Sequence, residues 1–388
     1  MELELPPADD PRRLEVRAWL EEHPDPTPSD LASAGYVVPH WPKPWGLDAE
    51  PLHQLIIEDE LKRAQVSRPI NPIGIGHCGP ILLVHGTEEQ RQRYIPPMMS
   101  CEEIWCQLFS EPGAGSDLAN TATRAERDGD HYIINGHKIW TSLAHYSQLG
   151  ILLARTDPNA PKHEGLSYFI IPMDLPGIEV TPIIDITGAH SFNEVFFTDV
   201  RIPAENLIGE ENKGWQLAKE TLTNERVTLS REGVQWGWGP TARDLTDLVR
   251  EQGGVGDPLL RDRLAQVYAE SEILRVHALR MVAARIAGQD APEASVRKAL
   301  NDPHGQRVFW LAKDLAGAAG MLADRGPLGT SPDWWDNGFL FAPALTVGGG
   351  TSEILRNVIA ERILGLPRDP DPDTGKPWNE TSRNRVST

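Results

Sequence analysis

Short runs of β-branched and aromatic residues are concentrated in the middle of the chain, with helical periodicity on both sides. The runs cover residues 132–136, 151–155, 167–171 and 194–197, and turn-forming residues separate them. Several short strands at this spacing predict a small barrel or sandwich. The order helical, β, helical therefore predicts an α+β fold.

The N-terminal segment carries the periodicity and start signals of helices. Residues 12–22 and 51–64 are amphipathic, and Thr87 with Gln90 has the spacing of a capping box, which predicts a helix start.

The helical period returns after residue 209. Asp257 before Pro258 predicts an N-cap followed by proline at the first helical position. Further helices are expected at residues 294–321 and 351–364, and Pro303 is expected to kink or split the former.

Composition narrows the classes of partner. The formal net charge of −19 argues against nucleic acid or an anionic membrane surface, because like charges repel. The three cysteines show no metal-ligand spacing, so no metal is expected. Without a signal peptide or a long apolar run, we expect a cytoplasmic protein.

Two glycine-rich segments are candidates for ligand contact. Gly348, Gly349 and Gly350 run into a helix that starts with Thr351 and Ser352. Glycine lets a backbone approach a ligand closely, and a helix N-terminus offers free N–H groups. The alternative is an ordinary helix entry with a Ser/Thr cap. The second segment, residues 110–117 (Ser-Glu-Pro-Gly-Ala-Gly-Ser-Asp), is by itself equally compatible with a surface turn.

Four motifs in order resemble those of the acyl-CoA dehydrogenases. They are residues 111–117, the strand-turn Asn-Gly-x-Lys-x-Trp at 135–140, residues 195–203 and the closing Gly-Thr-Ser-Glu at 350–353. The resemblance implies FAD, an acyl-CoA thioester substrate and an electron-transfer flavoprotein as acceptor. It also implies an N-terminal helical domain (1–104), a central β-barrel (105–212), a C-terminal four-helix bundle (213–366) and a polar, proline-rich tail (367–388), which we expect to be extended or mobile.

The resemblance also implies which residues line the flavin and the substrate. Trp140 would flank the isoalloxazine ring and Ser142 would hydrogen-bond its N5 edge, although a tryptophan on a strand is otherwise a barrel core residue. The N–H of Gly349 would donate to the thioester oxygen. The implied cofactor-binding set is Gln107, Phe109, Ser110, Gly115, Ser116, Trp140, Thr141, Ser142, Gly350, Thr351 and Glu353, and the substrate-binding set is Ser116, Arg226 and Gly349.

The catalytic base departs from the common pattern. Most members carry it in Tyr-Glu-Gly-Thr, whereas this chain has Gly-Gly-Gly-Thr at 348–351, so Gly349 occupies the base position. Another subset, which includes isovaleryl- and long-chain-type enzymes, places the glutamate before an arginine in the segment after the barrel, which corresponds here to Glu225 and Arg226. We therefore expect Glu225 to be the base. The alternative is an exposed Glu–Arg pair.

A second departure concerns the subunit contact around FAD. The Arg-x-x-Phe-Gly element of homotetrameric members is missing from residues 247–257, and Asp314 would place a negative charge near a pyrophosphate. The double departure resembles α2β2 members that act on steroid side-chain CoA thioesters, which predicts a second acyl-CoA dehydrogenase-like subunit and a bulky substrate. The alternatives are a diverged homotetramer, an oxidase or monooxygenase of the same fold, and a non-catalytic subunit that completes a partner's FAD site.

Overall fold

The computed structural model describes residues 6–228, 239–286, 294–321 and 332–381. The chain forms two compact units, which we call the barrel unit and the helical unit. The barrel unit comprises Glu4–Asp185, Ala189–Asn224 and Asp369–Thr388. The helical unit comprises Met1–Leu3, Ile186–Gly188 and Glu225–Arg368.

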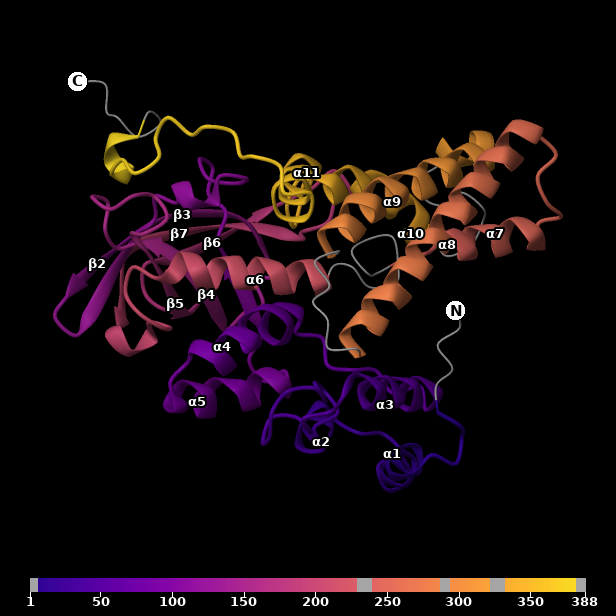
Figure 1. Cartoon of the computed structure of the whole chain (residues 1–388), viewed down its shortest axis with the longest axis horizontal. Coiled ribbons are helices and arrows are strands. Elements are labelled where there is room, and N and C mark those ends of the chain that lie inside the picture. The colour runs from indigo at the N-terminus through magenta and orange to yellow at the C-terminus, as the bar shows by residue number, and fades with distance from the viewer. Residues whose placement is uncertain (1–5, 229–238, 287–293, 322–331, 382–388) are drawn as a thin grey trace. The chain divides into compact units, whose positions relative to one another are not determined.

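The barrel unit begins with a group of helices (Figure 1). They are α1 (Pro11–Glu22), α2 (Pro28–Ser33), α3 (Pro51–Arg63), α4 (Gly79–His85) and α5 (Glu88–Met99). The predicted capping box of α5 is confirmed: Thr87 accepts from the N–H of Gln90, and the Gln90 side chain accepts from the N–H of Thr87. A buried ion pair between Arg13 and Glu60 joins α1 to α3.

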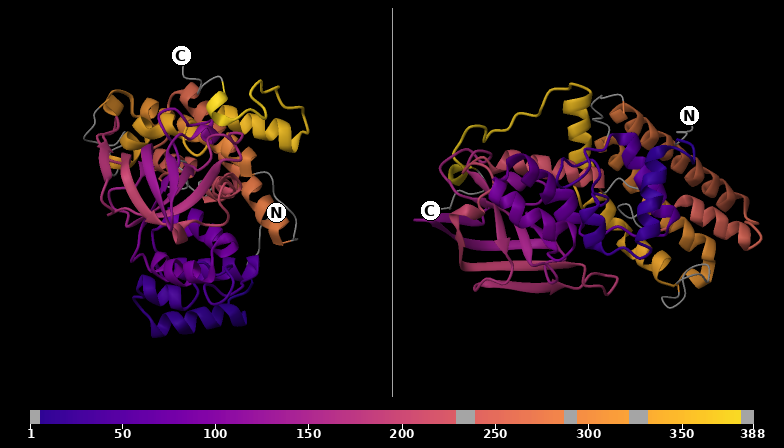
Figure 2. Two further views of the ribbon diagram at one scale, coloured as in Figure 1. Left: turned by 90° about the vertical axis from the view of Figure 1, so that its left-hand side faces the viewer. Right: turned by 90° about the horizontal axis from the view of Figure 1, so that it is seen from below.

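A curled seven-stranded sheet follows these helices (Figures 1 and 2). Its strands are β1 (Trp105–Leu108), β2 (Arg124–Asp128), β3 (His131–Ser142), β4 (Leu149–Arg155), β5 (Leu166–Pro172), β6 (Ile178–Ile183) and β7 (Phe192–Pro203). The strand order is β1-β4-β2-β3-β7-β6, and β5 pairs with β4. All four predicted runs lie in strands, so the central β region is confirmed; β1, β2 and β6 were not among the predicted runs.

Alternation along the strands gives the sheet two apolar faces. On β4, Ile151 and Leu153 join the core formed with the N-terminal helices and with α6 (Gly214–Thr228), whereas Leu152 and Ala154 face a second core inside the curl. Side chains of successive strand residues point to opposite faces, which explains this division.

The helical unit contains α7 (Ala242–Glu251), α8 (Pro258–Ile286), α9 (Ala294–Ala316), α10 (Pro332–Phe341) and α11 (Ser352–Val358). Asp257 accepts from the N–H of Leu259, as expected at the start of α8. The sequence predicted that Pro303 would kink or split this helix. Pro303 does not split it, because α9 runs through this residue unbroken. Val308 and Phe309 are fully buried in the core of this unit, and such burial outweighs the lost backbone hydrogen bond. None of the described helices is long and apolar enough to cross a membrane.

The C-terminal tail docks on the barrel unit, which corrects the expectation of a mobile segment. Trp378 donates from Nε1 to Oδ1 of Asn120 (3.1 Å), and its backbone N–H donates to the carbonyl of Ala160 (2.9 Å). The guanidinium of the buried Arg155 lies 4.8 Å from the centre of the Trp378 ring. Residues 367–371 have no regular secondary structure.

Candidate functional site

A buried ion pair anchors the glycine-rich loop that follows β1. Lys138 of β3 is fully buried, and its Nζ donates to Oε1 of Glu111 (2.8 Å) and to the carbonyls of Phe109 (2.9 Å) and Leu153 (2.8 Å). All three ammonium hydrogens are therefore used. A lysine at an inward position of an alternating strand requires such a partner, and this signal was available in the sequence.

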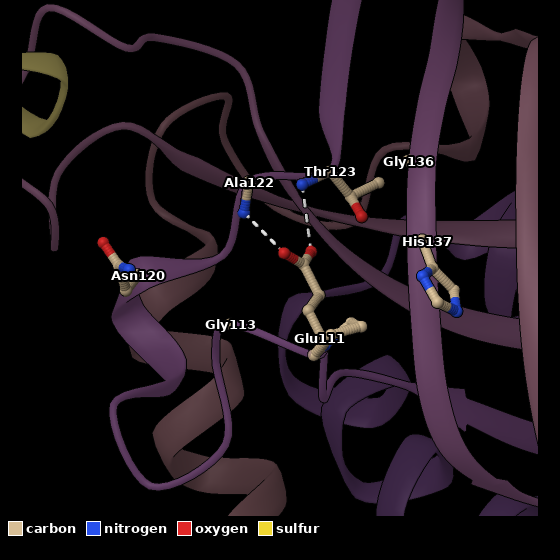
Figure 3. A pocket seen from close by; sticks show the side chains of 8 residues that line it. Glu111, Gly113, Asn120, Ala122, Thr123, Gly136 and His137 are labelled. Carbon is tan, nitrogen blue, oxygen red and sulfur yellow. Dashed lines mark hydrogen bonds between the residues drawn. The ribbon is translucent and has the colours of Figure 1, made fainter. Parts of the chain in front are cut away.

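The carboxylate of Glu111 is fully engaged and is not a candidate base. It accepts from the N–H groups of Ala122 (2.7 Å) and Thr123 (2.9 Å), as Figure 3 shows. Burial alone would raise the pKa of Glu111, but the charge of Lys138 and these hydrogen bonds together hold that pKa below its ordinary value. The same loop borders a shallow hollow that Asn120, Gly136 and His137 also line (Figure 3).

The tip of this loop is open. Gly115 and Ser116 are exposed, and a Cβ added at Gly115 would meet no described atom within 4 Å. The backbone at Gly115 does not have positive φ either, so neither conformation nor packing within the described chain requires glycine there. Close approach of a ligand is a remaining physical reason for it.

The two implied flavin residues that precede the loop are less exposed. Phe109 is buried, with its ring edge-on to Tyr168 (centroids 5.9 Å apart), and Gln107 meets Nδ1 of His77 at 2.9 Å. The carbonyl of Ser110 accepts from the N–H of Ile139 (2.9 Å), which ties the start of the loop to β3.

Trp140 lies in a β-bulge. Between two pairs of the β3–β7 register, β3 advances three residues (Lys138 to Thr141) while β7 moves two (Val195 to Asn193), so β3 holds one extra residue. Trp140 has φ 60°, and 57% of it is exposed. Its ring packs edge-on against Phe192, with centroids 6.0 Å apart. This exposed geometry argues against the alternative of a barrel core residue and is compatible with the predicted place of Trp140 beside the isoalloxazine ring.

The residues after Trp140 combine burial with an unused hydroxyl. Thr141 is 1% exposed, and its Oγ1 has no hydrogen-bond partner in the described part of the chain. Ser142, which ends β3, is half-buried. A buried hydroxyl without a partner is unfavourable, so its presence beside an exposed tryptophan points to a polar ligand.

The glycine-rich turn at residues 348–350 lies in the helical unit, between the 3₁₀ helix η5 (Ala342–Thr346) and α11 (Ser352–Val358). Gly349 and Gly350 have φ of 64° and 99°, which favour glycine, whereas Gly348 does not have positive φ. Thr351 caps α11 by accepting from the N–H of Ile354 (3.2 Å). The N–H of Gly349 bonds to no described residue, so this turn can present it to a ligand.

A buried lysine on α9 holds the same turn. Nζ of Lys298 donates to Oδ2 of Asp302 (2.5 Å) and lies 3.3 Å from the carbonyl of Leu345 and 3.4 Å from that of Gly350. Burial raises the pKa of Asp302 to about 6, although Lys298 opposes this shift. The sequence prediction did not include Lys298.

The remaining predicted residues also belong to the helical unit. Glu225 is half-buried on α6, four residues after Thr221, and Glu353 is exposed in the first turn of α11. The side chain of Arg226 lies outside the described residues. Asp314 pairs with Arg263 (2.7 Å), so a cation within the unit already balances its charge.

Family models match almost the whole chain. The N-terminal, middle and C-terminal domains of acyl-CoA dehydrogenases match residues 10–102, 106–200 and 212–364. The chain belongs to the acyl-CoA dehydrogenase family. The predicted family and fold class are thereby confirmed, and the protein is an acyl-CoA dehydrogenase.

Relatives in this family include proteins of known structure. The chain is 40% identical to the acyl-CoA dehydrogenase IpdE1 of Mycobacterium tuberculosis, over 92% of this chain and 89% of that protein. It superposes on the Tcur3481-Tcur3483 steroid ACAD with a TM-score of 0.78 and 30% identity, covering 95% of this chain and all of that one. A chain of the ChsE4-ChsE5 complex from Mycobacterium tuberculosis gives a TM-score of 0.77 and 30% identity, with the same coverage.

Proposed function

We propose that this acyl-CoA dehydrogenase carries out FAD-dependent α,β-dehydrogenation of an acyl-CoA thioester. The observation that carries the proposal is the bulge at Trp140, where an exposed aromatic ring stands on a left-handed backbone. A non-glycine residue in this conformation costs about 1–3 kcal/mol and persists where the surrounding structure over-determines it, which is typical of ligand-contacting sites.

The barrel unit suits a flavin. The Trp140 ring offers an apolar surface, and the buried hydroxyl of Thr141 has no partner among the described residues. The loop around Gly115 leaves room for close backbone approach. The other residues proposed to contact FAD are Gln107, Phe109, Ser110, Ser116 and Ser142 in the barrel unit. In the helical unit they are Gly350, Thr351 and Glu353. When bound, FAD supplies a hydride acceptor for the substrate β-carbon.

The chain's own residues would perform the proton chemistry. The carboxylate of Glu225 takes the α-proton, and the N–H of Gly349 donates to the thioester oxygen as negative charge develops there. Two observations support the role of Gly349: its N–H has no described partner, and Gly350 and Leu345 beside it have their carbonyls near the Lys298 ammonium. Arg226 and Ser116 would contact the CoA thioester.

Replacement of Glu225 by Gln tests this assignment. We expect Glu225→Gln to lower kcat by about 10³-fold, the scale of a lost general base, with FAD still bound. Glu220→Gln is the matched control, because Glu220 lies on the same helix, α6, and has no assigned role in binding or catalysis. Near-normal turnover in Glu225→Gln would refute its role as base. Catalysis retained only with an active partner subunit would indicate the non-catalytic alternative, and oxygen consumption during turnover would indicate an oxidase or monooxygenase.

We further propose a bulky acyl group, such as a steroid side chain. Residues 348–350 carry no side chains, which leaves volume at the acyl end, and the similarity to a steroid acyl-CoA dehydrogenase supports the same class. The measurement is kcat/KM for a steroid side-chain CoA thioester against a short straight-chain one. A preference for the short substrate would contradict the proposal.

The FAD site is proposed to require a second, related subunit in an α2β2 assembly. The missing Arg-x-x-Phe-Gly element supports this, and similar structures include two-protein complexes. The chain should be purified alone and together with a second acyl-CoA dehydrogenase-like chain, with FAD counted per chain. Full FAD occupancy and activity as a homotetramer would reject the assembly. Reduction of an electron-transfer flavoprotein during turnover tests the proposed acceptor.

A further inference from the structure

The bulge that displays Trp140 is held from behind by one buried amide. Asn193 of β7 is fully buried and stands opposite Thr141 in the β3–β7 register. Its Nδ2 donates to the carbonyl of Thr141 at 2.9 Å. This side-chain bond to a main-chain carbonyl lies where the extra residue interrupts the regular ladder, so it supplies a partner at the point where the sheet pattern is disturbed.

Two histidines fix the orientation of that amide. Nε2 of His190 lies 2.7 Å from Oδ1 of Asn193, and Nδ1 of His145 lies 3.1 Å from its Nδ2. The amide oxygen therefore accepts from His190, and the two amide hydrogens serve Thr141 and His145. Burial, together with the neighbouring His190, lowers the pKa of His145, which agrees with a neutral ring that accepts from the amide.

The two imidazoles also brace one another. Their centroids are 3.9 Å apart and their planes are 21° from parallel. His145 comes from the segment after β3 and His190 from the segment before β7, so the pair closes the end of the two strands around Asn193. Rotation of the Asn193 amide would break three polar contacts at once, so this amide is a rigid support for the strand.

We infer that Asn193 is a positioning residue, which fixes the Thr141 carbonyl and so holds Trp140 and Ser142 in the conformation that faces the cofactor. The inference rests on the proposed function in taking FAD as the ligand of this face. Asn193 itself lies behind the strand and has no exposed surface with which to touch a ligand.

A buried asparagine elsewhere in the unit provides a matched control. Asn206 is 6% exposed and donates from Nδ2 to the carbonyl of Ile170 at 2.9 Å, the same type of bond at the same distance. Ile170 lies on β5, which carries none of the residues assigned to the flavin face. Asn193→Asp and Asn206→Asp both replace an amide donor by an acceptor of the same size, so both should lower the melting temperature.

The two variants should differ at the flavin face. Hydrogen exchange of the peptide covering residues 140–145, measured on the full chain without FAD, should rise about tenfold in Asn193→Asp and stay unchanged in Asn206→Asp. With FAD added, together with the partner subunit if binding requires it, the Kd for FAD should rise about tenfold and the visible flavin spectrum should shift in Asn193→Asp alone.

The outcomes separate this inference from the proposed function. Unchanged exchange in Asn193→Asp, or equal changes in both variants, would overturn the role of Asn193. Failure of the wild-type protein to bind FAD would refute the proposed function, while the exchange comparison would still decide whether Asn193 holds the bulge. If Asn193→Asp does not fold, His190→Phe keeps the ring stack but removes the donor to the amide oxygen. Exchange of residues 140–145 should then rise several-fold, and no rise would equally overturn the inference.

Discussion

Each glycine-rich segment of the protein is held by a buried lysine–carboxylate pair, Lys138–Glu111 or Lys298–Asp302, and both lysines also donate to backbone carbonyls. The pairs differ in what else they bind. Beside the loop at 111–117, the carboxylate of Glu111 accepts from the N–H groups of Ala122 and Thr123. At the turn 348–351, the ammonium of Lys298 instead lies near the carbonyls of Leu345 and Gly350. A carboxylate satisfies backbone donors and an ammonium satisfies backbone acceptors. The lysine therefore leaves N–H groups such as that of Gly349 for a ligand.

The two anchors also differ in strength. The contacts of Lys138 to backbone carbonyls are 2.9 and 2.8 Å, whereas those of Lys298 are 3.3 and 3.4 Å. Hydrogen bonds weaken towards the longer end of this range. The comparison therefore predicts a larger loss of stability in the barrel unit when its lysine is removed.

Lys138→Met should have the largest effect. It leaves the buried Glu111 carboxylate without its cation and the carbonyls of Phe109 and Leu153 without a donor, which should reduce the free energy of unfolding by about 3–5 kcal/mol. Urea unfolding measures this. Arg201→Met, which removes an exposed ion pair with Asp128, is the control and should change little. Similar effects of the two substitutions would show that the loop is not anchored by charge.

Lys298→Met should have a smaller effect that depends on pH. The folded pKa of Asp302 lies above its ordinary value of 3.8, at about 6, so the contribution of Asp302 to stability falls as pH rises through that window. Lys298 lowers the pKa of Asp302, so without Lys298 the pH range over which stability is lost extends to higher pH. The deficit should therefore be small below pH 6 and reach about 2 kcal/mol at higher pH.

The double variant Lys298→Met/Asp302→Asn is the control for this pH dependence. It has no carboxyl group to titrate at position 302, so its deficit should be independent of pH. If the loss of stability in the single variant Lys298→Met did not depend on pH, the titration of Asp302 would not contribute to it.

Local signals predicted much of this structure. The capping box at Thr87 and the N-cap at Asp257 depend on residues two or three positions apart, and the strands show their own alternation. Family motifs also marked Trp140, but the bulge that exposes it depends on pairing with β7. The backbone partners of Asn193 and Lys298 could not be predicted in this way, because Asn193 and Thr141 are 52 residues apart, as are Lys298 and Gly350.

The docking of the C-terminal tail could not be predicted from local sequence either. The proline-rich composition of the tail predicted an extended or mobile segment, and residues 367–371 have no regular secondary structure. The docking of Trp378 depends on Asn120, 258 residues earlier, and on a buried arginine below the ring. Composition describes the conformation of a segment without a partner, and it carries no information about a partner so distant in sequence.

Trp378→Ala tests whether the docked tail supports the barrel unit around Asn120 and Arg155. Among the described residues, the glycine turn at 348–350 has no such support from the tail. The variant loses the bond to Asn120 and the ring over Arg155, so the free energy of unfolding should fall by about 1–2 kcal/mol. Proteolysis after residue 368 should also become faster, since the tail is released. Trp310→Ala, at an exposed tryptophan of the helical unit, is the control. Equal cleavage of the tail in both variants would contradict the docking.

Gly349→Ala should have the smallest effect on stability. It changes the backbone conformation of the turn and leaves the Lys298 contacts in place. An L-residue at φ 64° costs about 1–2 kcal/mol, so the variant should be less stable by about 1 kcal/mol. Gly348→Ala is the control because Gly348 lacks positive φ and should tolerate a methyl group. Alanine keeps its backbone N–H, so if that group stabilises the thioester oxygen, kcat of Gly349→Ala should fall far less than that of Glu225→Gln. A loss of kcat as large as that of Glu225→Gln, with normal stability, would mean that the turn contributes open volume rather than a hydrogen-bond donor.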